Sequence, residues 1–77
     1  MPHVIVKLLP GRSEDQKTAL ANAIVERVTS IARCEVDAVS VAFEEVSSED
    51  WTEKVYRPDI LGHPDRLYKK PGYGSLG

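Results

Sequence analysis

Proline at position 2, directly after Met1, is the residue whose type and position could do chemistry. Because a small second residue generally permits removal of the initiator methionine, we expect Met1 to be removed and the chain to begin with a secondary amine. A terminal α-amine has a pKa of about 7.7–8.0, and desolvation or a nearby cation lowers that pKa. Such an amine can act as a general base near neutral pH, and the rigid ring fixes its lone pair. The alternative is that Met-Pro is an ordinary start without catalytic meaning.

Other chemical motifs are absent from the sequence. It contains no Gly-rich phosphate loop and no Gly-x-Ser-x-Gly, and its two histidines, His3 and His63, lie far apart. The single cysteine, Cys34, cannot form an intrachain disulfide, and no cysteine–histidine cluster offers a metal cage. We therefore expect no metal and no cofactor, a surface position for His63, and a buried or partly buried Cys34 that serves as a small hydrophobic side chain.

Two strands and a helix must position Pro2. Residues His3–Leu8 alternate with period two, which predicts a strand with Val4, Val6 and Leu8 on one face. A second alternation predicts a strand at roughly 38–46. Between them Ser13 and Gln16 form a capping-box pattern, so we expect a helix from Glu14 to about Arg33. Its expected apolar stripe is Leu20, Ile24, Val28 and Ile31, with Lys17, Asn22, Glu26 and Arg33 mostly facing water.

The order strand, long helix, strand predicts an α/β fold made of one βαβ unit with two parallel strands. After it, Ser48-Glu49-Asp50 indicates the start of a short second helix from about Glu49 to Tyr56, which Pro58 ends. We expect residues 59–77 to form a C-terminal tail with a helical turn around Asp65–Lys69.

Length and charge limit the classes of protein that fit. The 77 residues predict a single domain over 1–77, and a net charge of −2 argues against a nucleic-acid surface. No apolar run approaches a membrane span, and the lone cysteine favours the cytoplasm. Because one βαβ unit leaves a sheet face and both sheet edges uncovered, we expect a homo-oligomer.

Three stretches together carry a family resemblance. Met-Pro-His-Val-Ile-Val-Lys opens the chain, Pro-Gly-Arg-Ser-Glu-Asp-Gln-Lys follows at residues 10–17, and Trp51 comes after the second strand. This pattern resembles the 4-oxalocrotonate tautomerase family. The tail Lys69-Lys70-Pro71-Gly72-Tyr73 looks most like the phenylpyruvate-tautomerase branch of that family.

The resemblance implies a cofactor-independent keto–enol tautomerase that acts on a 2-keto acid or its enol, such as phenylpyruvate or 2-hydroxymuconate. Pro2 would be the general base and acid, and Arg12 would bind a carboxylate or polarise a carbonyl. Trp51 would wall the substrate pocket. The alternatives are a solvated charge beside a helix cap for Arg12 and a core or interface anchor for Trp51.

One position departs from the family pattern. Ser40 stands where founding members have a second arginine, so a monocarboxylate substrate fits better than a dicarboxylate. His3, on the strand face opposite Pro2, is not expected to be catalytic. A substitute cation could come from one of five residues: Lys54, Arg57, Arg66, Lys69 or Lys70.

Two other functions stay open at this point. The same superfamily includes hydratases, dehalogenases and decarboxylases that use this proline, and a small dimerising module that binds a ligand without turnover belongs to a different class. For the oligomer, the long tail favours a dimer, while the Gly-Arg-Ser opening keeps a hexamer possible.

Overall fold

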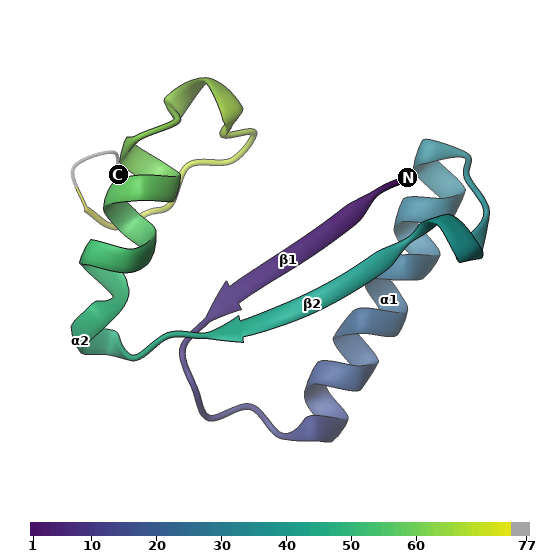
Figure 1. Ribbon diagram of the computed structural model, residues 1–77, viewed down its shortest axis with the longest axis horizontal. Coiled ribbons are helices and arrows are strands. Elements are labelled where there is room, and N and C mark those ends of the chain that lie inside the picture. The colour runs from purple at the N-terminus through teal and green to yellow at the C-terminus, as the bar shows by residue number, and fades with distance from the viewer. Residues whose placement is uncertain (75–77) are drawn as a thin grey trace. The chain divides into compact units, whose positions relative to one another are not determined.

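Two parallel strands form the sheet in the computed structural model, which describes residues 1–74 (Figure 1). β1 (His3–Leu8) pairs with β2 (Ser40–Glu45), in a register that runs from His3 opposite Ser40 to Leu8 opposite Glu45. β1 has the predicted bounds. β2 is shorter than predicted because Ala38 belongs to a 3-10 turn, η1 (Val36–Ala38).

The helix α1 (Glu14–Ala32) connects the two strands, so the predicted βαβ unit is confirmed. Its first turn is fixed by the predicted capping box. The Gln16 backbone N–H donates to Ser13 Oγ at 3.1 Å, and the Ser13 N–H donates to Gln16 Oε1 at 2.9 Å. The helix ends at Arg33, whose left-handed φ of 58° breaks the helical path.

The apolar stripe of α1 differs from the prediction. Ile24 and Val28 are half-buried as expected, but Leu20 is 42% exposed and Ile31 is 77% exposed. The shielded side also includes Ala21 and Val25, so the apolar residues of α1 occupy more than one side of the helix. The sheet of its own chain covers only one of those sides.

A second helix follows β2. The prediction that Pro58 ends this helix is wrong. α2 (Ser48–Trp51), capped by the Ser47 side chain, continues directly into a π-helix, η2 (Thr52–Leu61), with Pro58 inside. In an α-helix the proline ring would clash with the carbonyl four residues earlier. The wider π turn avoids that clash and bonds five residues back, as in the 2.8 Å bond from Gly62 N–H to the Arg57 carbonyl. A 3-10 turn, η3 (Pro64–Arg66), forms near the predicted position.

The chain forms two compact units, which we describe separately: a first unit from Met1 to Glu45 and a second unit that begins at Val46. The single domain predicted over residues 1–77 stays a prediction, and residues 75–77 of the predicted tail lie outside the described residues. Within residues 1–74, no helix combines the length and the apolar character that crossing a membrane requires.

Burial is concentrated in the second unit. Among residues 1–74 the buried hydrophobic side chains are Val55, 5% exposed, and Tyr56, 8% exposed, both on η2. No residue of the first unit is buried, although all of its residues are described. The βαβ unit therefore has no closed core of its own.

Candidate active site

Pro2 lies immediately before β1 and is half-buried. Its carbonyl accepts a hydrogen bond at 3.1 Å from the backbone N–H of Ser40, the first residue of β2. Met1 is fully exposed. The parallel pairing thus holds the main chain of Pro2, while removal of Met1 would take no packed side chain from the fold.

A polar pair adjoins Pro2. His3 and Ser40 face each other in the register, and His3 Nδ1 lies 2.6 Å from Ser40 Oγ. Period two places His3 and Pro2 on opposite strand faces, which explains why sequence reasoning left His3 out. The pairing itself depends on the register between two strands 37 positions apart, so no local pattern could have indicated it.

Arg12 lies between the turn that ends β1 and the cap of α1. Gly11 has φ 125°, a conformation that favours glycine, and Ser13 is the N-cap residue. The guanidinium is exposed and donates a long hydrogen bond, 3.4 Å, to the Leu9 carbonyl. Arg12 forms no salt bridge within the described part of the chain, so its charge can pair with an external carboxylate or enolate.

Pro2 and Arg12 lie at opposite ends of β1. The six residues of the strand separate them, and at about 3.3 Å per residue the strand alone covers about 17 Å from His3 to Leu8. Figure 1 shows the chain reaching the far end of β1 before it turns toward α1. A small keto acid is much shorter than this strand, so one chain does not bring its own Pro2 and Arg12 to the same substrate.

Trp51, the third predicted site residue, belongs to the second unit. It ends α2, is half-buried, and donates its indole N–H to Tyr73 Oη at 3.0 Å. The Tyr73 ring also packs on the Tyr56 ring, with centroids 5.6 Å apart and ring planes at 38°. Sequence reasoning used Tyr73 only as part of a tail motif and missed this contact.

The candidate substitute cations fall into two groups. Lys54 pairs with Asp50 at 3.2 Å, and Arg57 pairs with Glu53 at 3.4 Å, both one helical turn apart at the surface. The remaining three form no salt bridge within residues 1–74: Arg66, Lys69 and Lys70. The acidic partners make Lys54 and Arg57 poorer partners for a substrate carboxylate than the three residues without a salt bridge.

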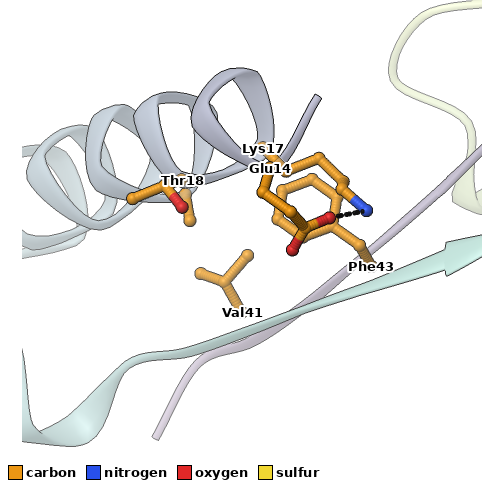
Figure 2. A pocket seen from close by; sticks show the side chains of 6 residues that line it. Glu14, Lys17, Thr18, Val41 and Phe43 are labelled. Atoms are coloured by element: carbon orange, nitrogen blue, oxygen red, sulfur yellow. Dashed lines mark ion pairs between the residues drawn. The ribbon is translucent and has the colours of Figure 1, made fainter. Parts of the chain in front are cut away.

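A groove of about 410 Å³ lies between α1 and β2. Figure 2 shows the charged ends of Glu14 and Lys17 together on the helix side, and Val41 and Phe43 on the strand side. Lys17 Nζ lies 2.6 Å from Glu14 and 3.4 Å from Glu45, and its side chain is only 17% exposed, which corrects the prediction that it faces water. The hydrogen bond that Lys17 donates to the Glu14 carboxylate raises the pKa of Lys17 above its usual 10.5. Since two carboxylates already neutralise the lysine, this groove is a poor site for an anion.

Metal-binding side chains do not gather in the described residues. No three of His, Cys, Asp and Glu lie close enough together there to hold an ion. Cys34 is a half-buried free thiol, as predicted. His63, predicted at the surface, is half-buried instead.

Comparison with known families decides the class of protein. The family described as "Tautomerase enzyme" matches residues 2–55, a range that includes Pro2, Arg12 and Trp51. The chain belongs to the tautomerase family. A "Probable tautomerase" of Xylella fastidiosa (strain 9a5c) is 45% identical over 76 residues, which cover 99% of this chain and 93% of that protein. "Tautomerase PptA" of Enterobacter sp. (strain 638) is 42% identical over 74 residues, which cover 95% of this chain and 97% of that protein.

Solved tautomerase structures share the fold. TomN, a 4-oxalocrotonate tautomerase homologue of the tomaymycin biosynthetic pathway, matches with a TM-score of 0.63 and 36% identity over 65% of this chain and 77% of that one. YwhB, another homologue of 4-oxalocrotonate tautomerase, matches with a TM-score of 0.59 and 33% identity over 60% of this chain and 75% of that one. The predicted family and fold class are therefore confirmed, and this tautomerase is an enzyme of the isomerase class.

Proposed function

We propose that this tautomerase interconverts the keto and enol forms of a 2-keto acid, such as phenylpyruvate or 2-hydroxymuconate, with the amino-terminal Pro2 as base and acid. The observation that carries the proposal is the position of Pro2. It is half-buried and held by its carbonyl to Ser40, next to a fully exposed Met1. Removal of Met1 would leave a secondary amine in a fixed orientation, partly shielded from water, which favours its neutral form.

The proposed reaction needs one proton acceptor and no other reagent. In ketonisation, the Pro2 nitrogen accepts the proton of the enol hydroxyl, and the electrons of the O–H bond form the carbonyl. The carbon–carbon double bond then takes a proton from the Pro2 nitrogen at the neighbouring carbon. The amine returns to its starting state, so neither a metal nor a cofactor enters the balance.

Arg12 and Trp51 are the proposed substrate-binding residues. The exposed guanidinium of Arg12, without a salt bridge in residues 1–74, would bind the carboxylate of the keto acid. Because β1 separates Pro2 from Arg12 of the same chain, we place at Pro2 the Arg12 of a second copy. Trp51 would stack on a planar substrate and exclude water.

Assembly follows from the same geometry. We propose a homo-oligomer, with a dimer preferred over a hexamer, that covers the apolar surfaces of the first unit. Parallel sheets in folded proteins are covered on both faces, whereas here Ile5 is 49% exposed on the face opposite Val4 and Val6. Ile31 and Val36, at 77% and 63% exposure, add apolar surface near the end of α1.

The cytoplasm is the proposed location, with residues 1–77 acting as one domain. The half-buried free thiol of Cys34 suits a reducing compartment. Fractionation of cells that make the untagged chain tests the location, because recovery of the protein from the membrane or an oxidising compartment would contradict it.

The deciding experiment retains Met1. A bulky residue inserted before Pro2 blocks methionine removal and turns the Pro2 nitrogen into an amide without a basic lone pair. We expect this form to lose essentially all ketonisation of phenylpyruvate enol, followed by absorbance, while mass spectrometry confirms each amino terminus. Pro2→Ala keeps a terminal amine, although a flexible primary one, and should retain a fraction of kcat.

Three outcomes would contradict the proposal, and each has a different meaning. If the chain with Met1 retained turns over as fast as the processed chain, Pro2 is not the base. If the processed chain does not turn over any keto acid or enol but hydrates, dehalogenates or decarboxylates a related acid, the chemistry belongs to another reaction of the same superfamily. A processed chain that binds these acids without any turnover would be a binding module.

A further inference from the structure

The C-terminal segment of the described chain is attached to Trp51 by a specific hydrogen bond. Tyr73 Oη accepts the indole N–H of Trp51 at 3.0 Å, across 22 positions of sequence. Trp51 is the only tryptophan of the chain. The geometry is that of a good N–H···O bond, and it satisfies the single donor that an indole has.

Two more contacts hold the same segment on η2. The Tyr73 ring packs against the Tyr56 ring, and Tyr56 itself is buried, 8% exposed. Gly74 has φ 73° and lies so close to the Tyr56 phenol that an added Cβ would overlap its oxygen and ring carbons. Tyr73 is thus held by its ring and by its neighbouring backbone, and its hydroxyl is directed at Trp51.

This arrangement fixes what Trp51 can offer a ligand. A free indole rotates about two side-chain bonds and can turn its N–H toward any acceptor. Here the N–H is already bonded to Tyr73, so the indole keeps one orientation and its edge donor is engaged. What remains for a ligand is the apolar ring face, which suits stacking with a planar group.

We propose that Tyr73 is a positioning residue that holds the Trp51 indole ready to stack on a planar, conjugated or aromatic 2-keto acid. The inference rests on the proposed role of Trp51 at the substrate. Tyr73 does not touch the substrate in this arrangement. It lowers the cost of ordering the indole when substrate binds, so it affects binding more than proton transfer.

The experiment compares Tyr73→Phe with Tyr68→Phe. Tyr73→Phe keeps the ring and removes only the oxygen that accepts the indole N–H, while Tyr68 is a fully exposed tyrosine of the same segment and serves as the matched control. We expect Tyr73→Phe to raise KM for phenylpyruvate about twofold to tenfold, with kcat changed by less than about twofold. Tyr68→Phe should leave both constants unchanged.

The intrinsic fluorescence of Trp51 gives a readout that is independent of turnover. Because the chain has one tryptophan, its emission reports on this indole alone. Loss of the bond to Tyr73 should shift the emission and increase quenching by added iodide in Tyr73→Phe, and not in Tyr68→Phe. Thermal unfolding of each variant shows whether the fold is retained.

A double-mutant cycle separates positioning from general packing. Trp51→Phe removes the indole N–H, so in that background Tyr73→Phe should have no further effect on KM. An equal KM increase in both backgrounds would overturn the proposal, as would a fluorescence shift in Tyr73→Phe with unchanged KM in an active enzyme. If the processed wild-type chain lacks tautomerase activity altogether, the proposed function fails, and the positioning role fails with it.

Discussion

The first unit and the second unit differ in whether they bury any side chains. In the second unit, Val55 and Tyr56 are buried, and the segment at Tyr73 folds back onto Tyr56 and Trp51. In the first unit, the strands are regular and α1 begins with a complete capping box, but no side chain is buried. Regular secondary structure and a closed core are thus separate properties, and the first unit has only the former.

This difference bears on function because Pro2 and Arg12 both lie in the first unit. The two residues lie at opposite ends of β1. Apolar side chains of β1 and α1 in the same unit are left exposed within the single chain. We infer that one event, association with another copy, supplies both the missing core and the missing arginine. The following predictions test that connection, beginning with the largest effect.

Ile5→Lys should disrupt the assembly. Ile5 is on the sheet face that α1 does not cover, and it is 49% exposed. Burying that exposed half on association contributes about 0.8–1.5 kcal/mol per isoleucine, half the value for a side chain that goes from exposed to buried. Loss of that contribution from two copies, with a charge in its place, should raise the dissociation constant about 100-fold or more. We expect sedimentation equilibrium at micromolar concentration to show 8.5 kDa chains with little activity.

Asn22→Lys is the control for this prediction, since it adds the same charge at an exposed position of α1. It should keep the oligomer. A wild-type chain that sediments as an active 8.5 kDa monomer would contradict the whole comparison between the two units.

Arg12→Ala should raise KM for phenylpyruvate about tenfold to a hundredfold, because a charged hydrogen-bond partner of the carboxylate is lost. Mixed oligomers then test which chain supplies the arginine. Chains with Met1 retained lack the base, and Arg12→Ala chains lack the cation. If Arg12 serves the Pro2 of another copy, a mixed dimer regains one complete site, and an equal mixture recovers about a quarter of the wild-type sites.

The opposite result has a clear meaning. If both residues act within one chain, no mixed dimer contains a complete site, and at substrate concentrations well below KM the mixture shows only the average activity of its two parts. Arg12→Ala kinetics within about twofold of wild type would instead assign Arg12 to the loop before α1 alone.

Local rules predicted the first unit better than the second. The β1 bounds and the capping box of Ser13 and Gln16 depend on residues close in sequence, and both were confirmed. The prediction that Pro58 ends the second helix was wrong because the rule that a helix ends before proline assumes α-helical geometry, and η2 is a π-helix. The prediction that Ile31 belongs to the packed stripe of α1 was wrong. Hydrophobic periodicity locates apolar residues on a helix but does not show which side of the helix packs on the rest of the chain.

The candidate site shows the same limit. Pro2, Arg12 and Trp51 could be proposed from residue types and a family resemblance, since each carries its own chemistry. The contacts of His3 with Ser40 and of Trp51 with Tyr73 join residues 37 and 22 positions apart. Such pairs depend on strand register and on how a tail folds back, which short-range sequence patterns do not encode.

Gly62→Ala should destabilise the second unit by about 1–3 kcal/mol, the usual cost of overpacking. A Cβ at Gly62 would lie 2.5 Å from the Pro58 carbonyl oxygen and 3.1 Å from that of Arg57, and both are backbone atoms that close the π-helix. Gly72→Ala is the matched control, because nothing lies within 4 Å of its added Cβ. Urea unfolding followed by Trp51 fluorescence measures both variants, and equal loss of stability in the two would show that the π-helix end tolerates a side chain.

The smallest effect is expected at Lys17, and it concerns pH. The hydrogen bond to Glu14 raises the pKa of Lys17 above 10.5, so the folded chain binds this proton more tightly than the unfolded chain does. The resulting stabilisation is fully present below pH 10.5 and is lost as the pH rises through the higher folded-state pKa. The stability difference between wild type and Lys17→Met should therefore stay constant from pH 6 to pH 9 and shrink above pH 10.5, measured by urea unfolding at each pH. Lys54→Met, which removes an exposed pair with Asp50 in the second unit, is the control for the loss of a lysine charge. A Lys17→Met difference that already disappears between pH 6 and pH 9 would mean that another group, not Lys17, controls the stability of the first unit in that range.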